Sequence, residues 1–575
     1  MRIWIASLLA VSVAANAQLR PSQPEPPSGW TEKKLATAKR YMVAAANPLA
    51  VEAGLRMLER GGNAVDAMVA TQLVLNLVEP SSSGIGGGAF LLYYDAKAKA
   101  IRAYDGRETA PGAASPALFA RPDGKPMAFI EARVGGRSVG TPGTPRLLEL
   151  AHIRHGRLPW KVLFEPAIQI AEKGFPASPR FVRLAGADNG LADEPAARAY
   201  FFGADGKPKP VGTVIRNPEF AATLRAIAAK GAGAFYSGDI ARDIVAAVHG
   251  HRNPGTLSLE DLAGYKVREV EPLCGPYRLW RLCGMPPSSS GGIAILQIMG
   301  ALSRFDLANS RPSSADIVHL VSEAERLAFA DRGKYVADDR FADVPVKGLV
   351  DAGYIAARSQ LIQPQKSMSK AQAGTPPGAR VAYAEDPVDE VIGTTQISIV
   401  DREGNAVSMT TTIEAFFGSR VMVRGFLLNN ELTDFNFLPV EDGQPVANSV
   451  APGKRPRSSM APFLVFDAGN GAFEMTLGSP GGSLIIGYVA KVLVATLDWK
   501  MDMQSAISLP NFGSRNGPTE IEKGTELEGV QAALKAMGHD VSVIDMTSGL
   551  QGIRRTRGGW EGGADPRREG VARGR

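Results

Sequence analysis

Residue types that often carry catalysis or bind metals are scarce in this chain of 575 residues, which has two cysteines and six histidines. The closest histidines, in His249-Gly250-His251, have no third ligand at a recognisable metal-site spacing. No fixed internal period or low-complexity repeat is present, which argues against a solenoid or another repeat fold. The sequence therefore gives no pattern for a metal centre and none for a repeat architecture.

Long apolar runs and an excess of one charge are also lacking. The net charge of +6 is modest for this length, and the arginines near the C-terminus are spread among glycines without interleaved aromatic residues. Beyond the N-terminal segment, no run is long enough and free enough of charge to span a bilayer. We therefore expect neither a nucleic-acid partner nor a membrane-embedded protein.

Residues 1–17 have the pattern of a secretory signal peptide. Arg2 supplies positive charge, residues 3–13 are largely apolar, and Ala15-Asn16-Ala17 is a small-residue cleavage site. The apolar stretch is too short for a membrane anchor. The sequence predicts a mature chain that begins at Gln18 and is periplasmic or secreted.

The two cysteines, Cys274 and Cys283, flank a segment that could form a short hairpin. In an exported protein they could be oxidised to a disulfide. Alternatively, they are unbonded thiols whose Cα atoms lie too far apart to be bridged. The sequence leaves both alternatives open.

What is present is the composition of a globular protein with an ample core, 45% hydrophobic and 21% charged. Proline at a first helical turn and apolar residues at helical spacing predict helices at 47–61, 63–76 and 317–329. Alternating β-branched residues predict strands at 395–400 and 407–412. This mixture indicates a layered α+β fold, although the length alone suggests several domains.

Residues 363–390 are rich in Gln, Ser, Lys, Gly, Pro and acidic residues, which predicts a mobile linker. The linker contains Ser367-Met368-Ser369-Lys370, which fits the Ser-x-x-Lys pattern of serine β-lactamases. That pattern requires a helix to align its two residues, and no Lys-Thr-Gly block follows. We reject this interpretation.

The most informative stretch, Gly393 to Asp401, places a threonine between a glycine and an apolar, β-branched strand. If the chain is cut before Thr394, that residue gains an α-amine beside its hydroxyl, and the amine can serve as its base. The alternative is that Thr394 merely opens an ordinary β-hairpin.

The chain resembles the γ-glutamyltransferase (γ-glutamyltranspeptidase) family of the N-terminal nucleophile hydrolases. The resemblance covers nearly the whole mature chain, and many short motifs occur in the family's order. Those that carry it are Gly61–Ala67, Gly84–Phe90, Asp105–Pro111, Gly140–Gly143, Pro286–Gly292, Gly393–Glu414, Asn429–Phe435, Lys454–Met460, Gly478–Ser483 and Glu561–Gly570.

The resemblance implies a four-layer αββα sandwich made of two polypeptides, which replaces the expectation of several domains. The precursor would cut itself between Gly393 and Thr394, giving a large subunit of residues 18–393 and a small subunit of residues 394–575. The enzyme would transfer the γ-glutamyl group of glutathione and related compounds to water, amino acids or peptides through a γ-glutamyl-threonine intermediate. The resemblance implies no metal or organic cofactor and no catalytic cysteine.

The resemblance also assigns roles to single residues. Thr394 would be the nucleophile, Thr412 would hydrogen-bond it, and Gly481 and Gly482 would supply backbone N–H groups to the oxyanion. The family's substrate pocket needs opposite charges at its two ends. By resemblance, Arg107, Ser458 and Ser459 would bind the α-carboxylate, and Glu414, Glu431 and Asp434 would bind the α-ammonium group.

Two positions depart from the family's pattern, since Glu414 replaces an asparagine of some members and Gln396 stands where many have histidine. The first should still bind an ammonium group, and the second puts the finer tuning of the nucleophile in doubt.

Two rival functions remain to be weighed. A cephalosporin-type acylase is disfavoured by Asp434, and an inactivated binding protein is disfavoured by the complete set of site residues.

Overall fold

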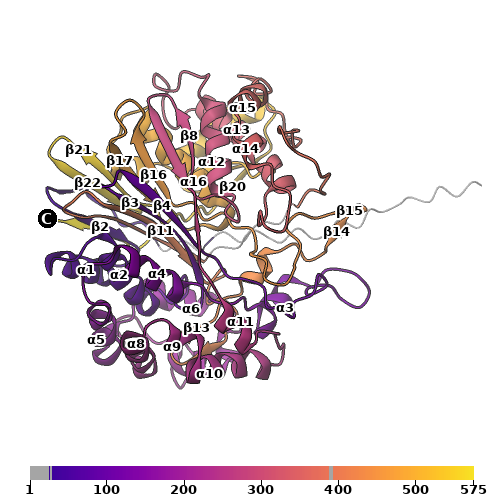
Figure 1. Cartoon of the computed structure of the whole chain (residues 1–575). Coiled ribbons are helices and arrows are strands. Elements are labelled where there is room, and N and C mark those ends of the chain that lie inside the picture. The colour runs from indigo at the N-terminus through magenta and orange to yellow at the C-terminus, as the bar shows by residue number, and fades with distance from the viewer. Residues whose placement is uncertain (1–24, 26–28, 387–392) are drawn as a thin grey trace, which may run out of the picture.

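The computed structural model describes Glu25, residues 29–386 and residues 393–575. The predicted signal peptide, residues 1–17, lies outside these residues. The described chain forms two stacked β-sheets with a layer of helices on each outer face (Figure 1). The four-layer αββα arrangement implied by the resemblance is confirmed.

The first sheet holds the strand that begins at Thr394. Its order is β23-β2-β10-β11-β3-β4-β7. Its strands are β2 (Met42–Ala45), β3 (Gly88–Asp95), β4 (Ala100–Gly106), β7 (Arg268–Val270), β10 (Thr394–Val400), β11 (Ala406–Thr412) and β23 (Val571–Gly574). The two predicted strands are confirmed as β10 and β11, and their antiparallel register places Thr394 directly opposite Thr412.

The second sheet has the order β1-β22-β21-β17-β16-β9-β8. Its strands are β1 (Ala36–Ala38), β8 (Leu273–Tyr277), β9 (Trp280–Gly284), β16 (Phe463–Asp467), β17 (Phe473–Gly478), β21 (Gln551–Thr556) and β22 (Gly559–Ala564). In the hairpin of β8 and β9, Cys274 lies directly opposite Cys283 and the two form a disulfide. Of the two alternatives for the cysteines, the disulfide is confirmed.

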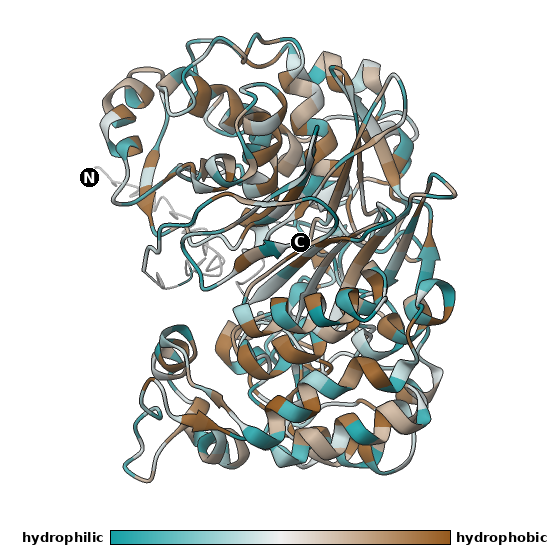
Figure 2. Cartoon of the chain, turned by 90° about the vertical axis from the view of Figure 1, so that its left-hand side faces the viewer, coloured by the Kyte–Doolittle hydropathy of each residue, from teal (hydrophilic) through white to brown (hydrophobic). Residues whose placement is uncertain are grey.

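Helices cover both sheets. On the side of the first sheet lie α1 (Pro48–Glu59), α2 (Ala64–Val78), α4 (Thr144–His155), α5 (Glu165–Lys173), α6 (Pro179–Ala187), α7 (Pro195–Phe201), α8 (Pro218–Lys230), α9 (Gly233–Tyr236), α10 (Gly238–Gly250) and α11 (Leu259–Gly264). On the side of the second sheet lie α12 (Gly291–Leu302), α13 (Ala315–Tyr335), α15 (Ala352–Ser359), α16 (Ile485–Leu497), α17 (Met503–Ser508) and α18 (Gln531–Ala536). The outer helices carry both hydrophobic and hydrophilic residues along their length (Figure 2).

The three predicted helices are confirmed as α1, α2 and α13. Asn47 caps α1 by accepting a hydrogen bond from a backbone N–H group, and Asn63 forms a capping box with Asp66 at the start of α2. Both caps satisfy backbone donors that a helix start would otherwise leave unpaired. No helix within the described ranges combines the length and the apolar character that a membrane crossing requires.

Alternation along β10 gives the sandwich two different interiors. Ile397 and Ile399 pack in the core beneath α1 and α2. Gln396 and Ser398, which alternate with them, face the second sheet, where the Ser398 hydroxyl donates to the carbonyl of Gln551 at 3.0 Å. The polar face of this strand is therefore buried between the sheets, which the alternating pattern alone did not reveal.

The predicted linker at 363–390 is described as far as residue 386, and that part lies against the body. Ser367 donates to Glu323 at 2.9 Å, and Asp386 accepts a hydrogen bond from Asn436 at 3.0 Å. The polar composition predicted a mobile segment, whereas these hydrogen bonds hold its described part against the body. Ser367 lies outside any helix, and the Lys370 side chain is exposed, in line with the rejection of the Ser-x-x-Lys pattern.

Candidate active site

Thr394 begins β10 and is buried, with 4% of its surface exposed. Its hydroxyl donates to Oγ1 of Thr412, 3.3 Å away, and the Thr412 hydroxyl donates to the carbonyl of Gly393 at 3.0 Å. The backbone N–H group of Glu414 donates to the same Thr412 oxygen at 2.8 Å. A chain of hydroxyl groups therefore runs from the proposed nucleophile to the carbonyl that it would attack.

Gly393 is enclosed by the loop that follows β11. A Cβ atom at this position would lie 2.1 Å from the carbonyl oxygen of Glu414, so the main chain leaves no room for a side chain. Within the loop, Glu414, Phe417 and Arg420 have positive φ values of 74°, 63° and 65°. Left-handed backbone at non-glycine residues stores strain, and such residues cluster at functional sites.

Arg107, which follows β4, is 1% exposed and lies between acidic residues. Its guanidinium contacts the Glu431 carboxylate directly and donates from Nη2 to Asp434 at 2.5 Å. It also donates to the carbonyls of Pro456 and Arg457 at 3.2 and 2.9 Å. The opposite charges expected at two ends of a pocket are in direct contact here.

Asn430 binds the loop that encloses Gly393 and directly precedes the turn that carries Glu431. Its side-chain NH₂ group contacts the Glu414 carboxylate, and its amide oxygen accepts from the backbone of Ala415 at 3.0 Å. The 3₁₀ turn that carries Glu431 and Asp434 begins at the next residue. The sequence analysis included Asn430 in a motif without giving it a role, and the structure shows that it holds the loop around Gly393 beside the Arg107 group.

Burial changes the acidity of carboxyl groups around Arg107. It raises the pKa of Glu431 well above its ordinary value, and the opposing attraction of Arg107 is the smaller effect. Burial likewise raises the pKa of Glu108, 4.0 Å from Arg107, to about 7. Carboxyl groups of this kind ionise more readily once a further cation arrives beside them.

Ser458 and Ser459 are buried and follow directly on the two carbonyls that contact Arg107. Arg332 donates to the Ser459 hydroxyl at 2.9 Å, and the backbone of Met460 donates to the Ser458 hydroxyl at 3.1 Å. Both serines thus follow the segment whose carbonyls accept hydrogen bonds from Arg107, and their binding of a substrate carboxylate stays a prediction.

Gly481 and Gly482 lie in the loop after β17, with positive φ values of 142° and 56°. This loop follows Gly478, the last residue of β17, where a Cβ atom would lie 2.3 Å from the side-chain oxygen of Gln396. Gln396 itself accepts a hydrogen bond from Thr410 at 2.7 Å between the sheets. The loop therefore begins beside a residue of β10 close to Thr394, and the approach of its N–H groups to an oxyanion stays a prediction.

Two site residues escaped the sequence analysis. Arg568 donates to the carbonyl of Thr394 at 3.2 Å, and Glu79 accepts a hydrogen bond from the Thr395 hydroxyl at 2.8 Å. Burial raises the pKa of Glu79 to about 7, although the charge of Arg568 opposes the change. Arg568 lies in a motif that carried the resemblance, but only the fold shows that it reaches the nucleophile.

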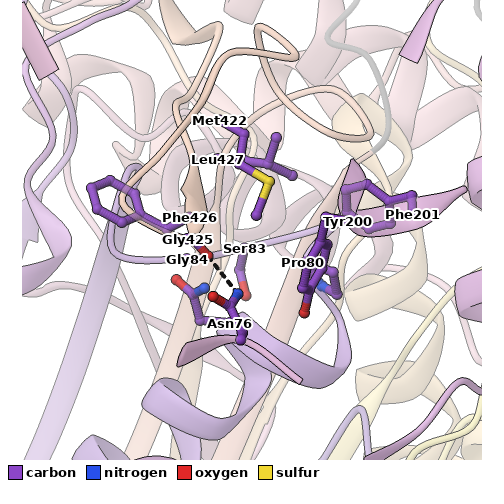
Figure 3. A pocket seen from close by; sticks show the side chains of 11 residues that line it. Asn76, Pro80, Ser83, Gly84, Tyr200, Phe201, Met422, Gly425, Phe426 and Leu427 are labelled. Atoms are coloured by element: carbon purple, nitrogen blue, oxygen red, sulfur yellow. Dashed lines mark hydrogen bonds between the residues drawn. The ribbon is translucent and has the colours of Figure 1, made fainter. Parts of the chain in front are cut away.

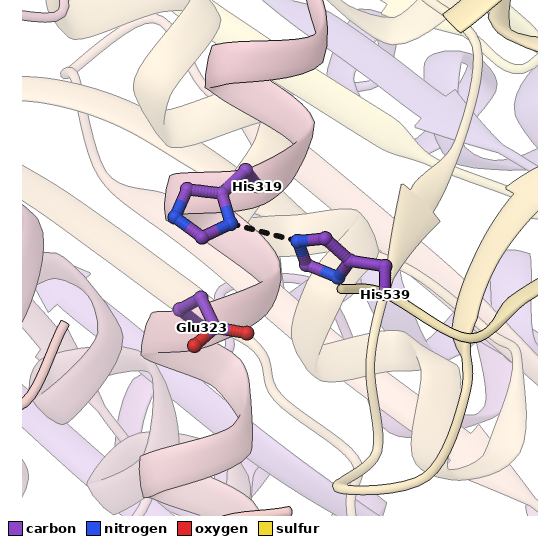
Figure 4. A group of neighbouring side chains, drawn as sticks. All are labelled: His319, Glu323 and His539. Carbon is purple, nitrogen blue, oxygen red and sulfur yellow. Dashed lines mark hydrogen bonds between the residues drawn. The ribbon is translucent and has the colours of Figure 1, made fainter. Parts of the chain in front are cut away.

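A cluster with metal-binding residue types lies elsewhere, between α13 and the segment before β20 (Val541–Ile544). His319, Glu323 and His539 place one ligand atom each within 4.8 Å of one another (Figure 4). The two rings share a hydrogen bond of 2.7 Å between His319 Nδ1 and His539 Nε2. Their other nitrogens lie 2.7 Å from the carbonyl of Gln363 and 2.7 Å from the hydroxyl of Thr519.

Glu323 in this cluster also has protein partners. It accepts hydrogen bonds from the Ser367 hydroxyl, the Met368 backbone and Arg326, at 2.9, 2.7 and 3.0 Å. Protein groups thus occupy the ring nitrogens and the carboxylate. We assign the cluster a structural role, which is to hold the start of segment 363–386 against the body.

A small pocket lies near the C-terminal end of α2 (Figure 3). Asn76, Pro80, Tyr200, Gly425 and Phe426 are among the residues that line it. None of the residues predicted for catalysis or substrate binding lines this pocket. It is therefore distinct from the site around Thr394.

Known proteins resemble this chain over almost its full length. The family model for gamma-glutamyltranspeptidase matches residues 50–574. A glutathione hydrolase proenzyme of Bacillus subtilis is 36% identical, with 99% of this chain and 98% of the relative covered. The acylase ACY 1 proenzyme of a Pseudomonas species is 35% identical, with 89% of this chain and 88% of the relative covered.

A solved structure agrees with these sequence matches. The cephalosporin acylase from Bacillus halodurans superimposes with a TM-score of 0.82 at 27% identity, covering 96% of this chain and 98% of that chain. Relatives of both activities thus share the fold, so the overall likeness does not separate them. The extent of the family match nonetheless shows that the chain belongs to the γ-glutamyltranspeptidase family.

Proposed function

We propose that this protein is a self-processing γ-glutamyltransferase and glutathione hydrolase whose nucleophile is Thr394. The observation that carries the proposal is the hydroxyl chain from Thr394 through Thr412 to the carbonyl of Gly393. It is supported by the relatives named glutathione hydrolase proenzyme, which match nearly the whole chain. The first bond that Thr394 cleaves would be the peptide bond between Gly393 and Thr394 in the protein itself.

In the first reaction, the Thr394 hydroxyl attacks the carbonyl carbon of Gly393. The hydroxyl proton passes toward Thr412, which in turn donates to the carbonyl oxygen as negative charge develops there. The C–N bond then breaks, the nitrogen takes up a proton, and an ester joins Gly393 to Thr394. Water hydrolyses this ester, leaving a carboxylate on Gly393 and a free α-amine on Thr394.

The cut would divide the chain into a large subunit, residues 18–393, and a small subunit, residues 394–575. Strands from both sides of the cut pair with one another within each sheet: β2 and β3 flank β10 and β11, and β9 pairs with β16. Because hydrogen-bonded pairs cross between the subunits, one αββα body would persist after cleavage.

The mature enzyme would bind a γ-glutamyl compound at the Arg107 group. The substrate's α-carboxylate would accept hydrogen bonds from the Arg107 guanidinium and from the hydroxyls of Ser458 and Ser459. A carboxylate suits the forked geometry of a guanidinium. Its α-ammonium would be bound by Glu414, Glu431 and Asp434. The ligand would thereby replace the direct contacts between Arg107 and the acids, and the raised pKa of Glu431 would fall beside the new cation.

The second reaction uses the freed α-amine as the base. An α-amine has an ordinary pKa of about 7.7 to 8.0, so a useful fraction is unprotonated near neutral pH. Thr394 attacks the γ-amide carbon, and the N–H groups of Gly481 and Gly482 stabilise the oxyanion. The amine leaves, and water, an amino acid or a peptide then takes the γ-glutamyl group from the threonine ester.

The site of action would be the periplasm or the extracellular medium. The pattern of residues 1–17 supports export, and the disulfide between Cys274 and Cys283 suits an oxidising compartment. Export would bring the enzyme to glutathione and peptides outside the cytoplasm.

The cephalosporin acylase is a specific rival because its structure superimposes on nearly the whole chain. Such an enzyme cleaves an amide whose acyl group lacks the free α-amino group. Glu431 and Asp434 would then have no substrate cation to bind besides Arg107, whereas a γ-glutamyl group supplies one. A γ-glutamyl anilide and a glutaryl anilide differ only in this amino group, so a preference for the first favours our proposal.

The decisive experiment combines a gel with an assay. Purified wild-type protein should give two fragments, with the smaller one beginning at Thr394, and should release aniline from the γ-glutamyl substrate. Thr394→Ala should stay uncut and inactive, while Thr394→Ser, which keeps a hydroxyl, should still be cut. Full activity in an uncut protein would refute the mechanism.

A further inference from the structure

The end of the sandwich opposite Thr394 is built from turns. β10 runs for seven residues from Thr394 to Val400, and at about 3.4 Å per residue its far end lies about 20 Å from the nucleophile. By the antiparallel register, the β10–β11 turn, the β3–β4 turn and the start of β2 all lie at that end. In the second sheet, the β21–β22 and β8–β9 turns likewise lie together at one end.

The turns of the two sheets contact one another. A Cβ atom at Gly559, where β22 begins, would lie 2.8 Å from the Cα atom of Lys39, which precedes β2. The guanidinium carbon of Arg402, in the β10–β11 turn, lies 5.1 Å from the centre of the Tyr41 ring. The backbone N–H group of Ala96, in the β3–β4 turn, donates to a side chain of the β10–β11 turn at 2.9 Å. The turns therefore form one continuous surface, which also carries the C-terminus (Figure 1).

Basic side chains cover this surface, which we call the basic end. It is defined by the exposed residues Lys39, Arg40, Lys97, Arg402, Arg555 and Arg557. None of the six forms a salt bridge with another described residue. Two acidic residues nearby are already paired, since Glu403 lies 2.9 Å from Arg157. Glu59 likewise lies 3.0 Å from Arg575. The basic end therefore has a positive field, although the net charge of the whole chain is only +6.

An exposed apolar residue accompanies these cations. Leu279, at the tip of the β8–β9 hairpin, is 75% exposed and lies between Arg278 and the half-buried Trp280 in the chain. The Lys500 ammonium group lies 5.6 Å from the centre of the Trp280 ring. Apolar and aromatic side chains bordered by cations are typical of surfaces that lie in the headgroup region of a bilayer.

The same features disfavour a nucleic acid as the partner. Single strands bind by stacking their bases on accessible aromatic rings, whereas Tyr41, the ring between the turns of the basic end, is 1% exposed. An exposed leucine gains little from a phosphate backbone but gains free energy when it leaves water among acyl chains. Of the polyanionic surfaces, a bilayer therefore fits the basic end better.

We propose that the basic end is a docking surface for an anionic phospholipid bilayer, on which the folded protein lies without crossing the hydrocarbon core. The negative potential of such a bilayer attracts lysine and arginine side chains, and Leu279 would enter the headgroup boundary. Because the basic end is opposite Thr394, the docked protein would keep its active site facing the solution. The inference does not depend on the proposed function.

Vesicle co-sedimentation of the mature protein tests the proposal. The wild type should bind vesicles that contain phosphatidylglycerol, dissociate as added salt screens the charges, and not bind phosphatidylcholine alone. The triple variant Arg402→Gln, Arg555→Gln, Arg557→Gln should bind about 10²-fold more weakly, since each cation lost near the surface weakens binding about fivefold. Leu279→Ser should bind about fivefold more weakly with an unchanged salt dependence.

The matched control is the triple variant Arg198→Gln, Lys207→Gln, Arg216→Gln, which removes three exposed cations near α7 and α8 and should bind as the wild type does. All variants should keep the wild-type midpoint of thermal unfolding, which shows that the fold is intact. Wild-type binding by the first triple variant, or equal binding of the wild type to both kinds of vesicle, would overturn the proposal. Tighter binding to duplex DNA than to the vesicles, at equal phosphate and salt concentrations, would also overturn it.

Discussion

Two buried polar networks hold segments from both sides of the proposed cut, and they are built differently. The nucleophile edge, defined as Gly393, Thr394, Thr412, Glu79 and Arg568, places several charges around one backbone bond. The tail clamp, defined as His319, Glu323, Arg326, Thr519 and His539, holds residues 363–369 through hydrogen bonds to protein partners.

The two networks differ in whether their contacts must be exchanged during the proposed reaction or are kept throughout. At the nucleophile edge a peptide bond would be broken and substrate would enter, so its contacts must be exchanged. In the clamp, the backbone of Ser367 also donates to the Met537 carbonyl at 2.7 Å, joining residues from the two proposed subunits. We expect changes at the edge to affect rates, in addition to any effect on stability, and changes in the clamp to affect stability alone.

The largest effect is expected for Thr412→Val, which keeps the shape of the side chain but removes the hydroxyl between Thr394 and Gly393. Loss of one oxyanion-hole donor costs about 10²- to 10³-fold in rate, and self-cleavage should slow by that order. Thr411→Val is the matched control, because the buried Thr411 hydroxyl has no hydrogen-bond partner. Time courses of fragment formation measure both, and equal slowing would refute the role of Thr412.

The next effect is expected for Arg107→Lys, tested on mature enzyme. Lysine keeps the charge but cannot bind a carboxylate in the forked geometry of a guanidinium. The kcat/KM for a γ-glutamyl anilide should fall roughly 10²-fold, and that for a neutral acyl anilide should remain low in both proteins. An unchanged kcat/KM would show that Arg107 does not bind the substrate.

The comparison is sharpened by pH, beginning with Glu79→Gln at the edge. The folded pKa of Glu79 is raised from 4.5 to about 7, so the folded state holds a proton that the unfolded state has lost. The stability of the wild type should therefore fall by up to about 3 kcal/mol as pH rises from about 4.5 to 7. Glutamine cannot titrate, so thermal unfolding of Glu79→Gln should lack this fall. An identical pH slope in both proteins would contradict the assignment.

The clamp should show the opposite dependence. Burial, helped by His319 and Arg326, lowers the folded pKa of His539 from 6.5 to about 4. The unfolded state then takes up a proton first, so stability is complete above about pH 6.5 and is lost as pH falls toward 4. His539→Gln should lose about 1 kcal/mol at pH 8 but show a shallower acid decline, with unchanged kcat. A lowered kcat at neutral pH would show that the clamp acts on the active site.

Features made by residues close together in the sequence could be predicted, and contacts between residues far apart in the sequence could not. The helices 47–61 and 63–76 followed from local caps and periodicity. The strands at 395–400 and 407–412 followed from their alternation and an intervening turn. For the described part of the predicted linker, residues 363–386, the composition misled, because polar residues such as Ser367 that usually contact water find partners on α13.

The sequence by itself determined the local elements, the threonine that follows a glycine and the motifs that identify the family, since each is carried by residues close together in the chain. Only the tertiary structure decided that Arg568 reaches Thr394 and Glu79 reaches Thr395, that Glu25 joins two arginines, and that His319 meets His539. These contacts join residues hundreds of positions apart or on different layers. They form because burial forces charged and polar groups to find partners, and the packing of the four layers chooses which ones.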